Sequence, residues 1–319
     1  MKNKTILSLL LITTILNANE STISKNFILT NISFNIDEDG NLNPNIFLPI
    51  YYGNSKQFYS AVGYSSTNSQ EVKVLDNFSE SKNAFISSSK DLTINYVSYK
   101  STLFSYSVFV GLESTFTNTT NTEFGYIHDS KNLFGKGDDY YISFDNNVEL
   151  DIKRHALVAD IFVPMGKYFS SKFFTSISPY TTIGVKQSTI FKPLVNETGT
   201  SSSSTSQDVA YTLRYDGLIK TGTFFDIGLV VYYDNQPLKY NIAQIAQNNN
   251  NYLFETNTID VNKITTKFLV KILLDVDIIG ELNPSIGYGI EKIKKVDNVM
   301  NETDTIEKKV ITFGFERIF

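Results

Sequence analysis

The sequence predicts an all-β protein: a single antiparallel, up-and-down transmembrane β-barrel of about 14 strands, with 12 and 16 strands as the alternatives. Three observations predict this fold. Apolar and polar residues alternate in long runs along most of the chain. Short and long connections follow one another between the later runs. The chain also begins with a pattern that is typical of exported proteins.

The first eighteen residues have the pattern of a secretory signal peptide. Lys2 and Lys4 precede an apolar run over residues 5–16, and the small residue Ala18 follows it. This run is too short to cross a bilayer as a helix, which needs about 20 apolar residues. We therefore expect residues 1–18 to be cleaved as a signal peptide and residues 19–319 to form the outer-membrane β-barrel domain.

Composition excludes several classes of function. The chain has a formal net charge of −5 and no cysteine. A negative net charge provides no basic field to attract nucleic acid, so we expect no nucleic-acid partner. The absence of cysteine excludes a disulfide framework and a thiolate metal site. We expect no cofactor.

The first half of the chain shows the less regular strand pattern. Expected strands, in order, are residues 27–36, 46–52, 58–66, 71–76, a short one at 84–88, 92–100, 104–116, 123–129, 140–148 and 155–164. With the later strands, the count is up to 16. Roughly 300 mature residues, at about 20–22 residues per strand with its share of loops, argue instead for about 14 strands.

The second half of the chain alternates more cleanly. The clearest runs are residues 209–219, 223–234, 264–276, 282–292 and 305–319, each with apolar residues on one face. Runs of this length suit a tilted membrane strand of about 9–11 residues plus overhang. A soluble sandwich would show strands of about five or six residues. The length of the runs therefore favours a membrane barrel.

The connections between the later strands support the same fold. Short connections are expected at residues 165–172, 220–223 and 277–280, and long ones at 190–207, 237–260 and 295–304. The Ser-rich tract 201–206 is interpreted as a flexible loop tip. Membrane barrels have short turns at one end and longer loops at the other, with an even number of strands.

The last strand alternates most regularly. Ile311, Phe313, Phe315 and the terminal Phe319 share one face. This ending resembles the closing strand of bacterial outer-membrane β-barrels, a broad, porin-like class rather than one family. The resemblance implies export to the bacterial outer membrane. It also implies that these four residues form an assembly signal, with the barrel assembly machinery and periplasmic chaperones as partners.

The lipid environment predicts which face of each strand points inward. A charge on the lipid face costs about 2–4 kcal/mol at the midplane, so the apolar faces must point outward. The charged residues expected to line the lumen are Arg154, Asp160, Arg214, Asp216, Asp226, Lys267, Lys271 and Glu291. Tyrosines near strand ends, such as Tyr232 and Tyr233, are candidates for the aromatic girdles at the membrane surfaces.

The sequence offers little chemistry. Its two histidines, His128 and His155, lie in unlike contexts, and we expect no catalytic role and hence no enzyme. Asp37, Asp39 and Asn41 have the alternating oxygen ligands of a calcium loop, but Ile46 stands where such a loop has a bidentate Glu. A hairpin turn uses the same residue types, and we favour the turn over a metal site.

The leading hypothesis for function is a porin-like channel for passive diffusion of small hydrophilic solutes. The alternative is a surface structural, adhesion or receptor barrel with a closed lumen, which acts through its extracellular loops. Outer-membrane lipid is the expected surrounding in both cases. The sequence leaves open whether the barrel is a homo-oligomer.

Overall fold

The computed structural model describes residues 31–36, 40–52, 58–74, 82–103, 106–129, 140–165, 167–192, 198–248, 251–274, 283–297 and 303–316. These residues form thirteen strands: β1 (Asn31–Ile36), β2 (Leu42–Tyr52), β3 (Phe58–Val74), β4 (Lys82–Leu103), β5 (Tyr106–Asp129), β6 (Tyr140–Pro164), β7 (Phe169–Lys192), β8 (Thr198–Ser206), β9 (Ala210–Lys220), β10 (Phe225–Asn248), β11 (Asn251–Leu274), β12 (Asn283–Asp297) and β13 (Thr303–Glu316). In this part of the chain there is no helix long and apolar enough to cross a membrane.

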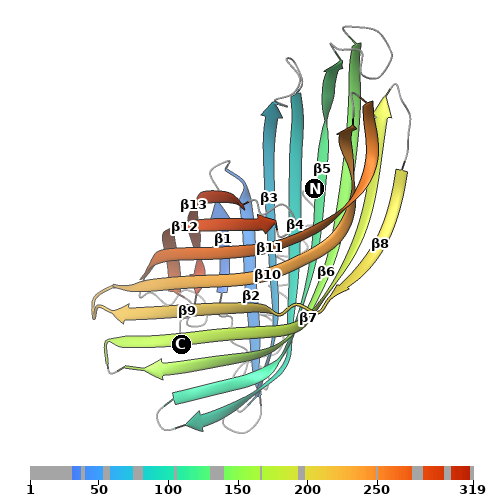
Figure 1. The fold of residues 1–319 in the computed structure, drawn as a ribbon. Coiled ribbons are helices and arrows are strands. Elements are labelled where there is room, and N and C mark those ends of the chain that lie inside the picture. The colour runs from blue at the N-terminus through green and yellow to red at the C-terminus, as the bar shows by residue number, and fades with distance from the viewer. Residues whose placement is uncertain are drawn as a thin grey trace, which may run out of the picture.

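Twelve of these strands close into an antiparallel barrel (Figure 1). Neighbours in sequence pair with one another, except for β8 and β9, and β1 pairs with β13 to close the cylinder. The strand β7 pairs with β9 through its first half and with β8 through its second half. Because β8 and β9 lie end to end along β7, they occupy one position in the wall. The number of strands in the closed barrel is therefore the lowest in the predicted range.

The strands of the first half are longer than the sequence suggested. The runs predicted as pairs, at residues 58–66 and 71–76, 104–116 and 123–129, and 140–148 and 155–164, are joined into β3, β5 and β6. The same holds for 84–88 and 92–100 within β4. The expected turns between them are strand. This merging explains why the barrel has fewer strands than the 16 that the sequence pattern suggested.

Two of the predicted long loops are also mostly strand. Residues 237–260 continue β10 and β11 as a hairpin that is paired from Phe225 and Leu274 outward to Asn248 and Asn251. The Ser-rich tract 201–206, predicted as a flexible loop tip, belongs to β8 and pairs with Thr181–Lys186 of β7. The short turn between β9 and β10 is present and places Gly222 at a φ of 73°, a conformation that glycine adopts without steric strain.

The long strands extend far beyond a membrane on one side. A strand of 24 residues, such as β5 or β10, is about 80 Å long, whereas a bilayer is crossed by about 9–11 tilted residues. Figure 1 shows β3 to β8 and the β10–β11 hairpin rising past the level at which β1, β2, β12 and β13 end. We call this part the projecting half and the closed cylinder below it the barrel half.

The projecting half contains a hydrophobic core of its own. Val148, Leu150 and Ile152 of β6 and Ile183 and Val185 of β7 form a buried cluster, and Leu238 and Tyr240 of β10 pack against it. The β10–β11 hairpin therefore lies against the inner face of β6 and β7. Burial of the ring raises the pKa of Tyr240.

Candidate functional site

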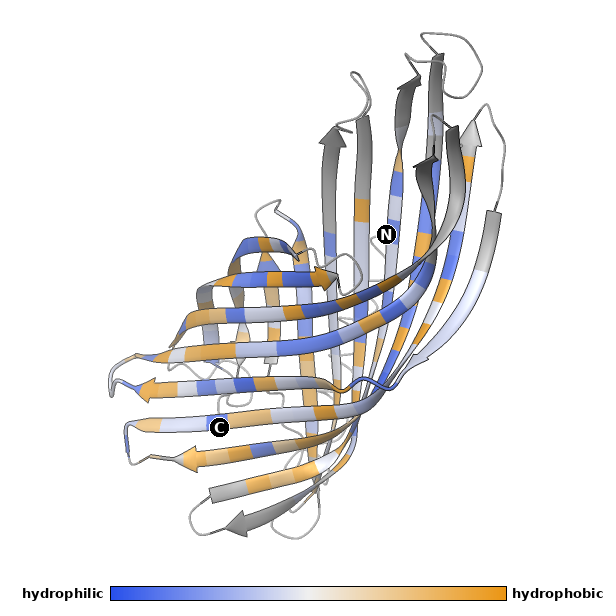
Figure 2. Ribbon diagram, in the orientation of Figure 1, coloured by the Kyte–Doolittle hydropathy of each residue, from blue (hydrophilic) through white to orange (hydrophobic). Residues whose placement is uncertain are grey.

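The outer face of the barrel half carries an apolar band. Exposed large apolar side chains occur on every barrel strand from β2 onward, including Val62, Leu112, Leu157, Ile177, Leu213, Val231, Phe268, Ile286 and Phe313. Figure 2 shows hydrophobic and hydrophilic residues alternating along these strands. A contiguous apolar surface of this kind is a liability in water but matches the hydrocarbon of a bilayer. The protein is therefore a β-barrel of the transmembrane type.

The inner face of the barrel half carries the charged residues predicted for the lumen. All eight alternate along their strands with residues of the exposed apolar band: Arg154 and Asp160 on β6, Arg214 and Asp216 on β9, Asp226 on β10, Lys267 and Lys271 on β11, and Glu291 on β12. Because successive side chains of a strand point to opposite faces, these residues lie inside the barrel. The fold brings charges from five strands onto the inner wall.

One row of this wall crosses five strands. Arg214 of β9, Tyr232 of β10, Lys267 of β11, Glu291 of β12 and Lys308 of β13 stand opposite one another in register. Residues directly opposite on adjacent strands have Cβ atoms about 4.5–5.5 Å apart. The row thus places a glutamate between two lysines and a tyrosine between two cations.

Two ion pairs tie the lower part of the inner wall together. Arg214 Nη2 lies 2.9 Å from Asp216 Oδ1, and Lys172 Nζ lies 3.2 Å from Asp160 Oδ1. The side chains of both aspartates are only 11–12% exposed. Sequence reasoning missed Lys172 because it assigned residues 165–172 to a turn. The period-two pattern over Phe169–Lys192 would have found it.

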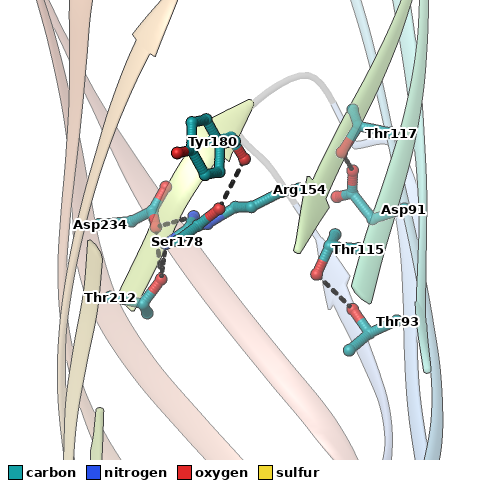
Figure 3. Close-up of polar contacts among 9 residues, drawn as sticks. All are labelled: Asp91, Thr93, Thr115, Thr117, Arg154, Ser178, Tyr180, Thr212 and Asp234. Carbon is teal, nitrogen blue, oxygen red and sulfur yellow. Dashed lines mark hydrogen bonds and ion pairs between the residues drawn. The ribbon is translucent and has the colours of Figure 1, made fainter. Parts of the chain in front are cut away.

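A third cluster lies where the barrel half meets the projecting half (Figure 3). Arg154 Nη1 donates a hydrogen bond to Asp234 Oδ1 at 2.9 Å, and Arg154 Nη2 donates one to Thr212 Oγ1 at 3.0 Å. Thr212 Oγ1 donates in turn to Asp234 Oδ1 at 2.6 Å. Arg154 on β6 thus reaches past β7 to both β9 and β10. We call this group the Arg154 clamp.

The Arg154 clamp stands at the point where β10 loses its partner on one side. The last residue of β10 paired with β9 is Asn235, opposite Tyr211. Beyond it, β8 pairs with β7 and not with β10 in the described sheet. Ser204 Oγ still donates a hydrogen bond to the carbonyl oxygen of Lys239. On its β10 side, the hairpin above the clamp is therefore joined to the wall by side chains rather than by a strand ladder, whereas β11 stays paired with β12 as far as Val261.

The aromatic girdle differs in part from the prediction. Tyr232 and Tyr233 were both predicted to lie at the membrane surface, but adjacent strand residues cannot share a face. Tyr232 belongs to the inner row, whereas Tyr233 lies on the outer face and stacks on Tyr211 with ring centroids 5.7 Å apart. His155 lies on the outer face as well, where its ring meets Phe116 edge-on.

The other predicted residues are placed only in part. Ile311 and Phe313 lie exposed on the outer face of β13 and Phe315 shares that face, while Phe319 lies outside the described residues. Asp37 and Asp39 of the calcium-loop candidate also lie outside them, as do residues 1–18. Asn41 is described, next to Gly40, whose φ of 79° is that of a turn. Within the described residues, no group of three His, Asp or Glu side chains is arranged to hold a metal ion.

Comparison with known proteins gives only distant likenesses. No protein-family model and no curated protein matches the chain. Solved structures with a similar course include the translocator domain of the autotransporter NalP from Neisseria meningitidis, with 8% identity, a TM-score of 0.45 and coverage of 99% of this chain and 98% of that one. The Pseudomonas putida toluene transporter TodX has 9% identity and a TM-score of 0.39, and covers 95% and 93%. The Ralstonia pickettii toluene transporter TbuX has 8% identity and a TM-score of 0.33, with the same coverage. With such low TM-scores, we base the function on this chain's own geometry.

Proposed function

We propose that the protein is an outer-membrane channel through which small hydrophilic solutes diffuse passively. The observation that carries this proposal is the charged inner wall of the barrel half, which faces inward at the same height at which the outer face is apolar. Charges on the inside of a barrel favour water there, because removing ions from water is costly even when they are paired. A barrel of this size lies between the filled eight-stranded barrels and the wide 16-stranded porins, so the channel is narrow.

The location follows from three features taken together. The apolar outer band requires lipid, the expected signal peptide at residues 1–18 would deliver the chain to the periplasm, and the closing strand carries the expected assembly signal. We propose that the barrel assembly machinery inserts the barrel with its short turns toward the periplasm. The projecting half then stands on the cell surface. The proposal includes no catalytic step.

Single-channel conductance of the refolded mature protein in a planar bilayer tests the channel. Stable conductance steps are expected for the wild type. In the double variant Lys267→Glu and Lys271→Glu, the charge of one inner wall is reversed, so the permeability ratio should shift toward cations at low salt, where screening is weakest.

Lys294→Glu is the matched control for this experiment. Lys294 is an exposed residue of β12 on the same face as the lipid-facing Ile290 and Tyr288, so reversing its charge leaves the inner wall unchanged. A folded barrel that inserts and never conducts would exclude the channel. Equal selectivity shifts in the inner and outer variants would show that the inner wall is not the path of the ions.

The second candidate is a surface barrel that acts through its projecting half with a closed lumen. It is favoured by the hydrophobic core that holds the β10–β11 hairpin against the inner face of β6 and β7. An apolar contact there narrows the outer mouth of the lumen. Conductance that appears only after this contact is weakened, for example by Leu238→Ser, would support this second candidate for the wild type.

A further inference from the structure

A groove of about 400 Å³ lies on the outer face of the wall, over β4, β5 and β6. Its lining includes two cross-strand rows. Lys90, Asn118 and Asp151 stand opposite one another in the upper row, and Leu92, Phe116 and Lys153 in the lower row. Tyr64 of β3 extends the lower row, opposite Leu92. All these side chains alternate with the inward-facing residues of their strands.

The groove lies at the upper edge of the apolar band. Along the outer face of β6, the exposed Leu157 is followed upward by His155, Lys153 and Asp151. On β5, the exposed Leu112 is followed by Ser114, Phe116 and Asn118. The floor of the groove is therefore apolar on its membrane side and polar on its upper side. A molecule that fills it must itself have an apolar part and a polar part.

The groove is lined by two lysines, Lys90 and Lys153, and by two aspartates, of which Asp91 turns to the inner face and accepts hydrogen bonds from Ser65 and Thr117. Lys90 and Lys153 are exposed, and neither makes an ion pair with any carboxylate among the described residues. Asp151 is engaged by Asn118 Nδ2, which donates a hydrogen bond of 2.7 Å to Asp151 Oδ1. In the lumen, by contrast, Arg154, Lys172 and Arg214 are all paired. The two groove lysines are available for an external anion.

The apolar floor is held in place by its neighbours. The rings of Phe116 and His155 meet edge-on with centroids 6.4 Å apart, and His155 Nδ1 lies 2.6 Å from Ser114 Oγ. Ser114 is 1% exposed. A floor whose rings are fixed by a hydrogen bond loses little side-chain entropy when a ligand covers it.

We propose that this groove binds a phosphorylated lipid of the outer leaflet. The phosphate groups lie between the ammonium groups of Lys90 and Lys153, and an acyl chain follows Leu92 and Phe116 down the apolar band. Lys90 and Lys153 stand two strands apart and one row apart, so their Cα atoms are about 12 Å from each other, which suits a headgroup with two phosphates. This inference rests on the membrane location in the proposed function.

Native mass spectrometry of the folded barrel with added lipid tests the groove. The probes are bisphosphorylated lipid A, its monophosphorylated form, phosphatidylethanolamine, and inorganic phosphate. We expect binding of the bisphosphorylated lipid, weaker binding of the monophosphorylated one, and none of phosphatidylethanolamine or free phosphate. Each lysine near a charged membrane surface contributes about 1 kcal/mol, or about fivefold in affinity, so Lys90→Gln with Lys153→Gln should weaken lipid A binding about 25-fold.

Lys186→Gln is the matched control, because Lys186 is an exposed lysine of the neighbouring strand β7 outside the groove lining. Phe116→Ser, which keeps both lysines, should also weaken lipid A binding, because it removes part of the apolar floor under the acyl chain. The proposal would be overturned if the groove and control variants lost the same affinity for lipid A. It would also be overturned if phosphatidylethanolamine bound as well as bisphosphorylated lipid A. Conductance is measured on the same samples. A barrel that conducts but binds no lipid A would overturn the lipid site and leave the proposed channel standing. A barrel that fails to insert would overturn the proposed function.

Discussion

The outer face of β6 is apolar in the barrel half and charged in the projecting half. In the barrel half, the outer residues Leu157 and Ile161 are apolar and exposed, and the inner face carries the charged Asp160 beside the buried Ala156 and Val158. In the projecting half, the inner residues Leu150 and Ile152 are apolar and buried. The outer residues beside them are charged. One uninterrupted strand thus passes from a membrane protein's pattern to that of a water-soluble one.

This difference shows that the environment of the outer face, and not the strand itself, decides which face is apolar. Below Arg154 the outer face meets lipid, so polar groups can only be satisfied inside. Above it the outer face meets water, so apolar groups must be buried against one another. The Arg154 clamp stands at the change, and three predictions test the comparison across it.

The largest expected effect is the loss of the clamp. Arg154→Ala leaves the carboxylate of Asp234, whose side chain is 14% exposed, without its cation, and breaking such a pair costs about 3–5 kcal/mol. The free energy of unfolding in lipid vesicles, measured with denaturant, should fall by that amount. Hydrogen exchange should rise most in the upper parts of β10 and β11.

The double variant Arg154→Ala with Asp234→Ala is the control for the clamp, since it removes both charges. It should be more stable than Arg154→Ala alone, because no buried charge is left unpaired. If the free energy of unfolding of the double variant falls by the sum of the falls in the two single variants, the pair does not couple the two halves.

A charge added to the outer face should lower the free energy of unfolding in the barrel half but not in the projecting half. Phe173→Arg places a charge on the outer face of β7 among lipid-facing residues, where it costs about 2–4 kcal/mol. Thr182→Arg places the same side chain on the outer face of the same strand above the clamp, where exposed substitutions stay within about 0.5 kcal/mol. Comparison of the two unfolding free energies locates the membrane surface. Equal losses of unfolding free energy in the two variants would show that the membrane surface does not lie at the Arg154 clamp.

The smallest expected effect comes from the core of the projecting half. Ile183→Val removes one buried methylene from a fully buried side chain, which costs about 0.5–1.5 kcal/mol. Hydrogen exchange should increase in the projecting half only. A similar change on the lipid face, Ile177→Val, creates no cavity and serves as the control. Equal protection in both variants would mean that Ile183 is not part of a packed core.

The sequence predicted the strands correctly where the apolar residues stay on the same face along the whole strand. The closing strand, the outward faces of β9, β11 and β12, and the short turn before β10 were all predicted, because lipid on one side imposes a period of two. It failed at residues 149–154 of β6, where Leu150 and Ile152 alternate with charged residues in the opposite phase. A change of phase looks like a turn in a sequence, although the strand continues.

Local residue preferences therefore determined the strand type, the membrane-facing side chains and the closing strand. The tertiary structure alone decided that the long strands run on past the membrane and that β8 and β9 share one place in the wall. It also decided that Arg154 of β6 meets Asp234 of β10 at the clamp. The physical reason is that each of these features depends on contacts between distant segments. A period of two reports which face is apolar, but it does not report whether lipid, water or another strand covers that face.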